Sequence, residues 1–524
     1  MRTTSLARVA MPMRVLRTVG IVALALFVMS CDKHITQSED LLPLVASSTD
    51  AGAGNWKMIV LATPNQVAVV APTAVTSDAY KAELAAIKTA QASLTNAQRE
   101  RIDYWAGGGV LRWNQILRSL VARYNLPPAP RADGSYVFPD ANNPFGDPQF
   151  PFANPPYAAR AYSYVSVAQY EALKAAWFYK YQYNRLSPAK ADPDIRALVP
   201  ISDLPSYPSE DAVMAGVTVQ LLSTLFPAAV EEITLKGAQQ REAALLSGKA
   251  TSSDLAAGLA LGRSIATLVL ARASTDGTSN AVGTPAQWAN LASAAQARGE
   301  IPWISREIPA RPPMLPNFGA VQAWNLTSAD IVSVRPAPPP STSSAQMKTE
   351  TAEVRETVER LTREQRAIAQ KWNDGAGTYT PPGHWNDIAA DHIRDARMSE
   401  VRAARTFALL NMAMHDVAVG CWDTKYRYYN PRPAQLDPSI KTVIGLPNFP
   451  SYPSGHSTFS SAAATTLTYL FPEGASSFTS MAAEAGMSRL YGGIHYRSDI
   501  NGGSEHGKRV GTAVVSYARA DGSP

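Results

Sequence analysis

Three short segments near the C-terminus carry the kinds of residue that hold a tetrahedral oxyanion. Lys425 and Arg432 lie in the segment KYRYYNPRP, and Arg489 lies in SRLYGGIHYRSD. Three cations brought into one pocket need an anion to balance them, and arginine offers planar pairs of donors that suit oxyanion oxygens. Ser454 and Gly455 precede an Ala/Ser/Thr-rich stretch, so a hydroxyl and backbone N–H groups can face the same anion at a helix start. These five residues predict an oxyanion-binding pocket.

Two histidines and a carboxylate add reactive groups to this pocket. His495 and Asp499 lie four residues apart, one helical turn, so the carboxylate can accept the Nδ1 proton and leave Nε2 free to attack or ligate a central atom. His456 directly follows Gly455 and is placed for proton transfer. Each fragment alone also fits a surface hydrogen bond or a helix cap, but the combination predicts catalysis by His456, His495 and Asp499.

The elements that must position these groups are predicted to be helices. Of the 524 residues, 46% are hydrophobic and 17% are charged, which is ordinary for a globular protein. Apolar residues recur at helical spacing, as at Val213, Val217 and Leu221, and no segment has the pattern of a β-hairpin. We therefore predict an all-α fold.

The chain also repeats itself at an offset of 245 residues. PSYPS occurs at 205–209 and again at 450–454, and Lys180 and Asp254 match Lys425 and Asp499. This register predicts two duplicated helical bundles packed together, with only the C-terminal bundle catalytic. The first copy lacks the chemistry, because five pocket positions are replaced by Ser187, Glu210, Asp211, Ala244 and Ala250. Two acids at the mouth would repel an anion, so the first bundle is predicted to be a packing scaffold.

The N-terminus predicts export. Four arginines precede the apolar run VGIVALALFVMS, which is typical of a signal peptide, and the Cys31 that follows resembles a lipobox cysteine. Lipidation at Cys31 would make a membrane-anchored lipoprotein facing the periplasm or cell exterior; an uncleaved anchor is the alternative. Without the signal the chain has 44 basic and 43 acidic residues, so no nucleic-acid partner is expected. No segment beyond the N-terminus is expected to span a membrane.

The predicted organisation has five parts. They are a lipoprotein signal peptide (1–30), an N-terminal tether (31–95), a degenerate first helical bundle (96–280), a Pro-rich connector (281–345) and a catalytic bundle (346–524).

The three C-terminal segments resemble the signature of the superfamily that joins type 2 phosphatidic acid phosphatases, bacterial acid phosphatases and vanadium haloperoxidases. A looser resemblance, which includes GTYTPPGHWN at 377–386, points to the bacterial haloperoxidase-like branch. The signature positions are Lys425, Arg432, Pro433, Pro453, Ser454, Gly455, His456, Ser488, Arg489, His495 and Asp499.

The resemblance implies either of two chemistries at one pocket. In a haloperoxidase, His495 holds vanadate, His456 is the acid–base group, and peroxide and halide are the substrates. In a phosphatase, His495 attacks the phosphorus of a phosphate ester to form a phosphohistidine, His456 protonates the leaving oxygen, and no cofactor is needed. A non-catalytic phosphate-binding lipoprotein is a third possibility, which the complete histidine set opposes.

Aromatic residues favour the haloperoxidase. Trp422 and Phe449 match positions that line the halide site of the chloroperoxidase type, and His384 is placed to line the pocket mouth. The alternative for both aromatic residues is a place in the core. Asn430 and Pro431 depart from the family pattern, in which an aromatic residue often precedes the arginine.

Overall fold

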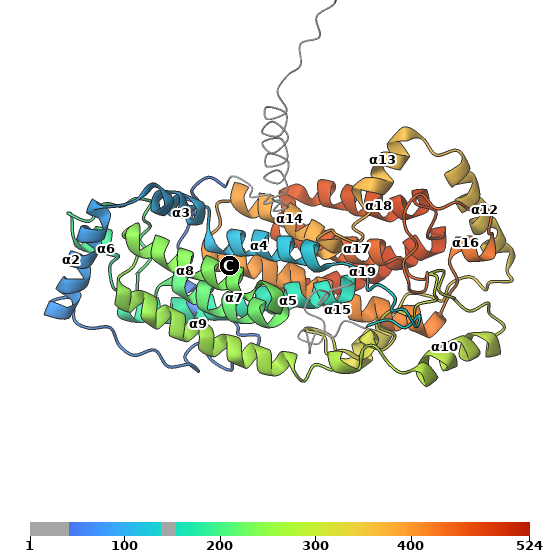
Figure 1. Cartoon of the computed structure of the whole chain (residues 1–524), viewed down its shortest axis with the longest axis horizontal. Coiled ribbons are helices and arrows are strands. Elements are labelled where there is room, and N and C mark those ends of the chain that lie inside the picture. The colour runs from blue at the N-terminus through green and yellow to red at the C-terminus, as the bar shows by residue number, and fades with distance from the viewer. Residues whose placement is uncertain (1–40, 138–153) are drawn as a thin grey trace, which may run out of the picture. The chain divides into compact units, whose positions relative to one another are not determined.

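The regular structure of the chain is helical (Figure 1). A computed structural model describes residues 41–137 and 154–524. These residues form no β-strand, and their β-structure is an isolated bridge between Pro130 and Tyr136. The all-α prediction is therefore confirmed. Residues 41–524 form one compact unit, while the predicted signal peptide and Cys31 lie outside the described residues.

The N-terminal half contains one long helix, α5, and shorter helices around it. Its elements are η1 (Ala51–Asn55), α2 (Asp78–Ala92), α3 (Asn96–Ala106), α4 (Gly109–Tyr124), α5 (Pro155–Tyr183), α6 (Pro188–Ala191), α7 (Glu210–Leu225), η2 (Pro227–Ala229), α8 (Val230–Leu246), α9 (Ser252–Ala273) and η3 (Thr278–Asn280).

The connector and the C-terminal half contain a second long helix, α15. Their elements are α10 (Pro285–Ala297), η4 (Phe318–Ala320), α11 (Ser328–Ser333), α12 (Ala345–Glu359), α13 (Arg363–Lys371), α14 (Thr380–Asp395), α15 (Glu400–Tyr428), α16 (Pro433–Leu436), α17 (Gly455–Leu470), η5 (Pro472–Gly474), α18 (Ala475–Tyr491) and α19 (Arg497–Arg519).

The helix bounds of the two halves agree at the offset of 245 residues. Helices α5, α7 and α8 begin and end at the positions that match the ends of α15, α17 and α18. A buried ion pair recurs at the same offset: Arg160 Nε lies 2.7 Å from Asp276, and Arg405 Nε lies 2.7 Å from Asp521. The two halves thus share local structure, and duplication stays our interpretation of that agreement.

Close helix contacts fix where the pocket-bearing helices begin. Helix α7 packs on α9, α17 packs on α19, and α5 and α15 lie against each other between the two pairs (Figure 1). At Gly507 of α19 a Cβ atom would stand 2.3 Å from the carbonyl oxygen of Thr458 on α17, so only glycine fits there. The backbone N–H of Ser454 then donates to the carbonyl of Asp499 at 2.9 Å, which ties the start of α17 to the start of α19.

The segments outside the two helix groups also pack on them. The Glu171 carboxylate on α5 accepts the backbone N–H groups of Ile59, Val60 and Leu61 at 2.8–2.9 Å. In the connector, the N–H of Trp303 donates to the carbonyl of Tyr429 at 2.9 Å. The domain boundaries drawn from the sequence stay a prediction.

One expectation about membrane spans needs correction. The segment Ser252–Asn280, which includes α9, is long and apolar enough to cross a membrane by length and composition, with 39% of its apolar window buried. The sequence-based expectation that no such segment follows the N-terminus was therefore wrong on composition. Its helix α9 packs against α7.

A buried histidine on α19 is expected to make the fold acid-sensitive. His506 is fully buried, neither ring nitrogen has a hydrogen-bond partner, and burial lowers its pKa to about 3. Below pH ~6.5 the unfolded chain binds a proton at His506 that the folded chain does not, which costs about 1.4 kcal/mol of stability per pH unit. Between pH 7.5 and 4.5, we expect the free energy of unfolding to fall by about 2–3 kcal/mol less in His506→Leu than in wild type. Urea unfolding at both pH values measures this difference, and equal losses in the two proteins would contradict it.

Candidate active site

The oxyanion-binding residues lie at the ends of four C-terminal helices. Lys425 is in the last turn of α15, and Arg432 directly precedes α16. Ser454 caps α17, where its Oγ accepts the N–H of Ser457 at 3.4 Å, and Arg489 is in the last turn of α18. Helix ends carry backbone N–H or C=O groups without partners inside the helix, and side chains flank them. Here such ends bring Lys425 and Arg489, which lie 64 residues apart in the chain, to a single pocket.

The three cations of this pocket are buried without a carboxylate partner. The Lys425 Nζ donates to the carbonyl oxygens of Pro450 and Ser451, both at 2.9 Å. Arg432 donates to the carbonyls of Phe449 and Ile494. None of the three cations is more than 2% exposed, and none forms an ion pair with a carboxylate of the described residues. Because buried charge without a counter-charge is costly, an external anion would stabilise this group of cations.

Other buried cations of the chain show what is missing here. Lys180, which matches Lys425 at the repeat offset, lies 2.8 Å from the Glu210 carboxylate. Arg405 pairs with Asp521. In the pocket, by contrast, burial lowers the pKa of Lys425 to about 7 and the pKa values of Arg432 and Arg489 to about 10. A bound oxyanion would reverse these shifts by supplying the counter-charge.

His495 is held by a network that leaves its Nε2 lone pair facing the cations. Its Nδ1 lies 2.8 Å from Asp499 Oδ2, and the same oxygen accepts the Ser451 hydroxyl at 2.5 Å. The Arg432 Nη1 lies 3.0 Å from Nε2. Since guanidinium only donates, Nε2 is the acceptor and Nδ1 carries the proton.

The charge states in this network follow from burial. Burial raises the pKa of Asp499 to about 6, so it is a carboxylate at neutral pH. Burial and the positive charge of Arg432 hold the pKa of His495 well below its usual value. A neutral His495 with a free Nε2 is the form that can ligate or attack a central atom.

Asp374, which is not among the predicted site residues, lies between His384 and His456. Its carboxylate lies 3.1 Å from Nδ1 of His384, and its Oδ2 lies 3.8 Å from Nε2 of His456. The His384 ring stacks on Trp372 with centroids 4.3 Å apart, and the Trp372 carbonyl accepts Arg489 at 2.5 Å. Asp374 has a backbone φ of 44°, a strained region for a residue other than glycine. The positive φ marks Asp374 as unusual, but it is a property of the folded chain and cannot be seen in the sequence.

His456 is placed for proton transfer but is neutral in this environment. Its Nε2 is buried and has no hydrogen-bond partner, and burial together with Arg489 holds its pKa well below the usual value. An anion in the pocket would favour the protonated ring.

Space at the start of α17 fits a ligand. A Cβ atom added at Gly455 would meet no atom within 4 Å. In the first half, Glu210 occupies the matching position and its carboxylate binds Lys180. The first half therefore supplies its own anion where the C-terminal half leaves room for one.

The comparison with protein families agrees with this geometry. Residues 405–522 match the family model of the PAP2 superfamily. We refer to residues 405–522 as the PAP2 region. All the oxyanion and catalytic residues predicted from the sequence fall inside the PAP2 region, whereas His384 and Asp374 precede it. A comparison with curated proteins finds no match.

Three solved structures of bacterial proteins share the fold of the chain. A vanadium-dependent iodoperoxidase is 24% identical, with a TM-score of 0.54, and the match covers 69% of this chain and 91% of that one. A vanadium-dependent chloroperoxidase in its apo form is 13% identical, with a TM-score of 0.50 and coverage of 70% and 94%. Its holo form is 14% identical, with a TM-score of 0.51 and coverage of 73% and 96%. The chain therefore has the vanadium haloperoxidase fold.

Two aromatic residues of the PAP2 region lie against the cations. The ring centroids of Trp422 and Phe449 are 5.1 Å apart, and the Phe449 ring lies 5.0 Å from Lys425 Nζ and 5.1 Å from Arg432 Cζ. The Trp422 indole donates to the carbonyl of Met314 in the connector at 3.1 Å and is 1% exposed. Phe449 thus borders the pocket, while Trp422 supports it from the core.

The PAP2 region offers an anion site rather than a metal-cation site. No group of three or more His, Cys, Asp or Glu side chains suited to a metal ion occurs in residues 41–137 and 154–524. The Cys421 thiol is free and buried on α15.

Proposed function

We propose that the chain is a vanadate-dependent enzyme of the haloperoxidase type. The observation that carries the proposal is the group of three buried cations that form no ion pair with a carboxylate of the described residues, together with the Nε2 lone pair of His495 that faces Arg432. A tetrahedral oxyanion with one open coordination position fits such a site, because the cations balance its charge and the imidazole supplies the remaining ligand.

The residues present fit vanadate. His495 would ligate it, and Lys425, Arg432, Arg489 and the backbone N–H of Gly455 would hold its oxygens. The open space beside Gly455 is the place for such a group. When bound, vanadate supplies a Lewis acid that activates hydrogen peroxide for the two-electron oxidation of a halide.

The chain's own residues prepare and serve that chemistry. Asp499 holds the proton on Nδ1 of His495 and fixes the ring, with Ser451 fixing the carboxylate in turn. His456 accepts and returns protons at Nε2. Phe449 keeps water from one side of the cations and leaves a partly positive, apolar border, which suits a large, weakly hydrated halide ion.

A phosphatase is the second candidate, supported by the match of residues 405–522 to the PAP2 superfamily. In a phosphatase, Nε2 of His495 would attack phosphorus and His456 would protonate the leaving oxygen. The position of Phe449 and the fold shared with vanadium-dependent iodoperoxidase and chloroperoxidase structures support the haloperoxidase instead.

One set of assays on the full chain separates these functions. The purified protein is tested with and without orthovanadate, for peroxide-dependent oxidation of iodide, bromide and chloride and for hydrolysis of a chromogenic phosphate ester. Vanadate-dependent halide oxidation is the expected result. Phosphate release that vanadate inhibits would support the phosphatase, and neither activity beside tight phosphate binding would support the non-catalytic alternative.

We also propose that the protein is exported and lipidated at Cys31, because the basic, apolar and cysteine segments stand in the order of a lipoprotein signal. Mass spectrometry of the N-terminal fragment from membranes tests this, since an unmodified Cys31 would contradict it.

Asp374 is expected to favour the protonation of His456 and to weaken oxyanion binding. Asp374→Asn removes the one negative charge near Arg489 and His456 while keeping an oxygen for His384. Oxyanion binding should tighten by about fivefold, roughly 1 kcal/mol, because the pocket gains net positive charge. Turnover should fall about 10–100-fold and its pH optimum should move lower, because the negative charge of Asp374 no longer stabilises protonated His456.

Calorimetric titration with vanadate and pH–rate profiles measure the two effects of Asp374→Asn. Asp391→Asn, at an exposed carboxylate on α14, is the matched control. Unchanged affinity and an unchanged pH profile would remove Asp374 from the mechanism.

A further inference from the structure

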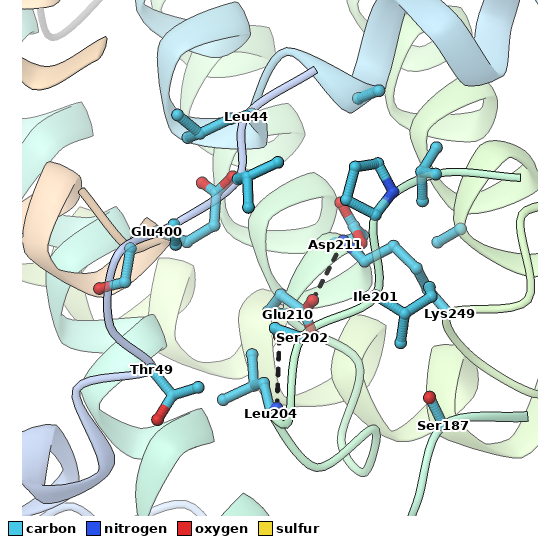
Figure 2. A pocket seen from close by; sticks show the side chains of 18 of the residues that line it. Leu44, Thr49, Ser187, Ile201, Ser202, Leu204, Glu210, Asp211, Lys249 and Glu400 are labelled. Carbon is cyan, nitrogen blue, oxygen red and sulfur yellow. Dashed lines mark hydrogen bonds and ion pairs between the residues drawn. The ribbon is translucent and has the colours of Figure 1, made fainter. Parts of the chain in front are cut away.

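A cavity of about 400 Å³ lies in the N-terminal half, at the positions that repeat the oxyanion pocket (Figure 2). Ser187, Glu210 and Asp211 line it. At the same offset the C-terminal pocket has an arginine, a glycine and a histidine. The first half has thus kept a pocket while losing the groups that bind an oxyanion.

The charged groups around this cavity neutralise one another in part. Lys249 Nζ lies 2.5 Å from the Asp211 carboxylate and 3.1 Å from that of Glu210. Lys180 Nζ lies 2.8 Å from the other oxygen of Glu210. Two carboxylates and two ammonium groups therefore balance, and an oxyanion would meet no free cation there.

A third carboxylate on the wall remains without a counter-ion. Glu400, the first residue of α15, accepts the backbone N–H groups of Gly109 and Val110 at 2.7 and 2.8 Å. It forms no ion pair within the described part of the chain. Burial, opposed by these N–H groups, raises the pKa of Glu400 to about 7, and the negative charge of Asp211 adds to the rise. The cavity thus has an excess of one negative charge when Glu400 is ionised.

The cavity also contains an unused polar group and an apolar wall. The hydroxyl of Ser187 is buried, only 4% of the residue is exposed, and it has no hydrogen-bond partner. Figure 2 shows Ser187 at one edge of the cavity lining, with Leu44 and Leu204 across the view from it and Ile201 beside Lys249. Buried hydroxyls without partners are rare, so a ligand that completes the hydrogen bond is expected.

We propose that this cavity binds a small organic ammonium ion. The ammonium group would pair with Glu400 and the apolar body would contact Ile201 and Leu204. This inference is independent of the proposed catalytic function, and it gives the N-terminal half a role beyond the packing scaffold predicted from the sequence.

The test compares matched probes on the full chain purified in detergent. Phenethylammonium and its anionic counterpart 3-phenylpropionate are titrated calorimetrically at pH 8, where Glu400 is ionised. We expect phenethylammonium to bind with a Kd below about 1 mM and the anion not to bind. Glu400→Gln should weaken the amine at least about tenfold, because it removes the unpaired charge and keeps the size.

Two further variants make the result specific. Leu204→Phe introduces the larger side chain that the second half has at the matching position, Phe449. It narrows the cavity and should also weaken amine binding. His495→Ala alters the other pocket and should change amine binding by no more than about twofold.

Several outcomes would overturn the proposal. They are no detectable binding of phenethylammonium, equal binding of the anion, binding that survives both Glu400→Gln and Leu204→Phe, and binding that His495→Ala removes. If Glu400→Gln fails to fold, Leu204→Phe alone decides.

Discussion

His495→Ala is expected to abolish turnover and to weaken oxyanion binding at least about 1000-fold. The variant removes Nε2, which accepts from Arg432 at 3.0 Å while Nδ1 is engaged by Asp499 at 2.8 Å. The effect holds whether this nitrogen ligates vanadate or attacks phosphorus. Vanadate titration and either activity assay measure it.

His506→Leu is the matched control for His495→Ala. It also removes a buried histidine, here within α19, but one whose nitrogens form no hydrogen bond with the described residues. Its turnover should stay within about threefold of wild type at pH 7.5. Activity that survives His495→Ala would place the chemistry elsewhere.

The parts of the site that the sequence could predict are those set by local spacing. His495 and Asp499 are four residues apart and make the predicted contact, although His495 precedes α19, so the contact spans the start of that helix rather than one turn within it. Ser454 caps α17 and Gly455 is its first residue, so their place at a helix start follows from capping preferences. The long Ala-rich stretches made the all-α class predictable for the same reason.

The parts that the sequence could not predict depend on packing between distant segments. Asp374 reaches the pocket from the loop before α14, 82 residues from His456, and no periodic pattern marks it. Ser451 belongs to the repeated PSYPS and is not among the predicted site residues, yet its hydroxyl donates to Asp499. In the first half the two acids were expected to repel an anion, whereas Lys180 and Lys249 form ion pairs with them. Such pairings are set by tertiary structure, which residue spacing alone does not determine.

Gly455→Glu is expected to give the oxyanion pocket an internal carboxylate that pairs with Lys425, as Glu210 pairs with Lys180 in the first half. A Cβ at Gly455 meets no atom within 4 Å, and Glu210 at the matching position places its carboxylate 2.8 Å from Lys180. The new carboxylate should therefore pair with Lys425 and occupy the place of the external anion. Turnover should fall at least about 100-fold, because the site loses its free charge to an internal group.

The same variant should be more stable than wild type at neutral pH. Pairing a buried lysine whose pKa is lowered to about 7 removes a cost of burial, which we expect to raise the free energy of unfolding by about 1–3 kcal/mol. The direction of the pH dependence follows from Glu210. Although burial opposes them, Lys180 and Lys249 hold the pKa of Glu210 below its usual value. The gain in stability from a paired carboxylate is therefore present at pH 7 and is lost as acid protonates the carboxyl. Urea unfolding at pH 7 and pH 3 measures the gain and its loss.

Glu210→Gly is the reciprocal variant and gives the opposite sign. It leaves Lys180 without its carboxylate and should lower stability by about 2 kcal/mol or more, while added phosphate should restore part of the loss. In wild type, phosphate or vanadate should raise the unfolding midpoint through the C-terminal pocket, and Gly455→Glu should remove that response. A Gly455→Glu variant that is active, or that still gains stability from vanadate, would show that the external anion binds away from Lys425. Loss of function together with a gain in stability would show that this fold keeps three buried cations unpaired because its reaction needs them.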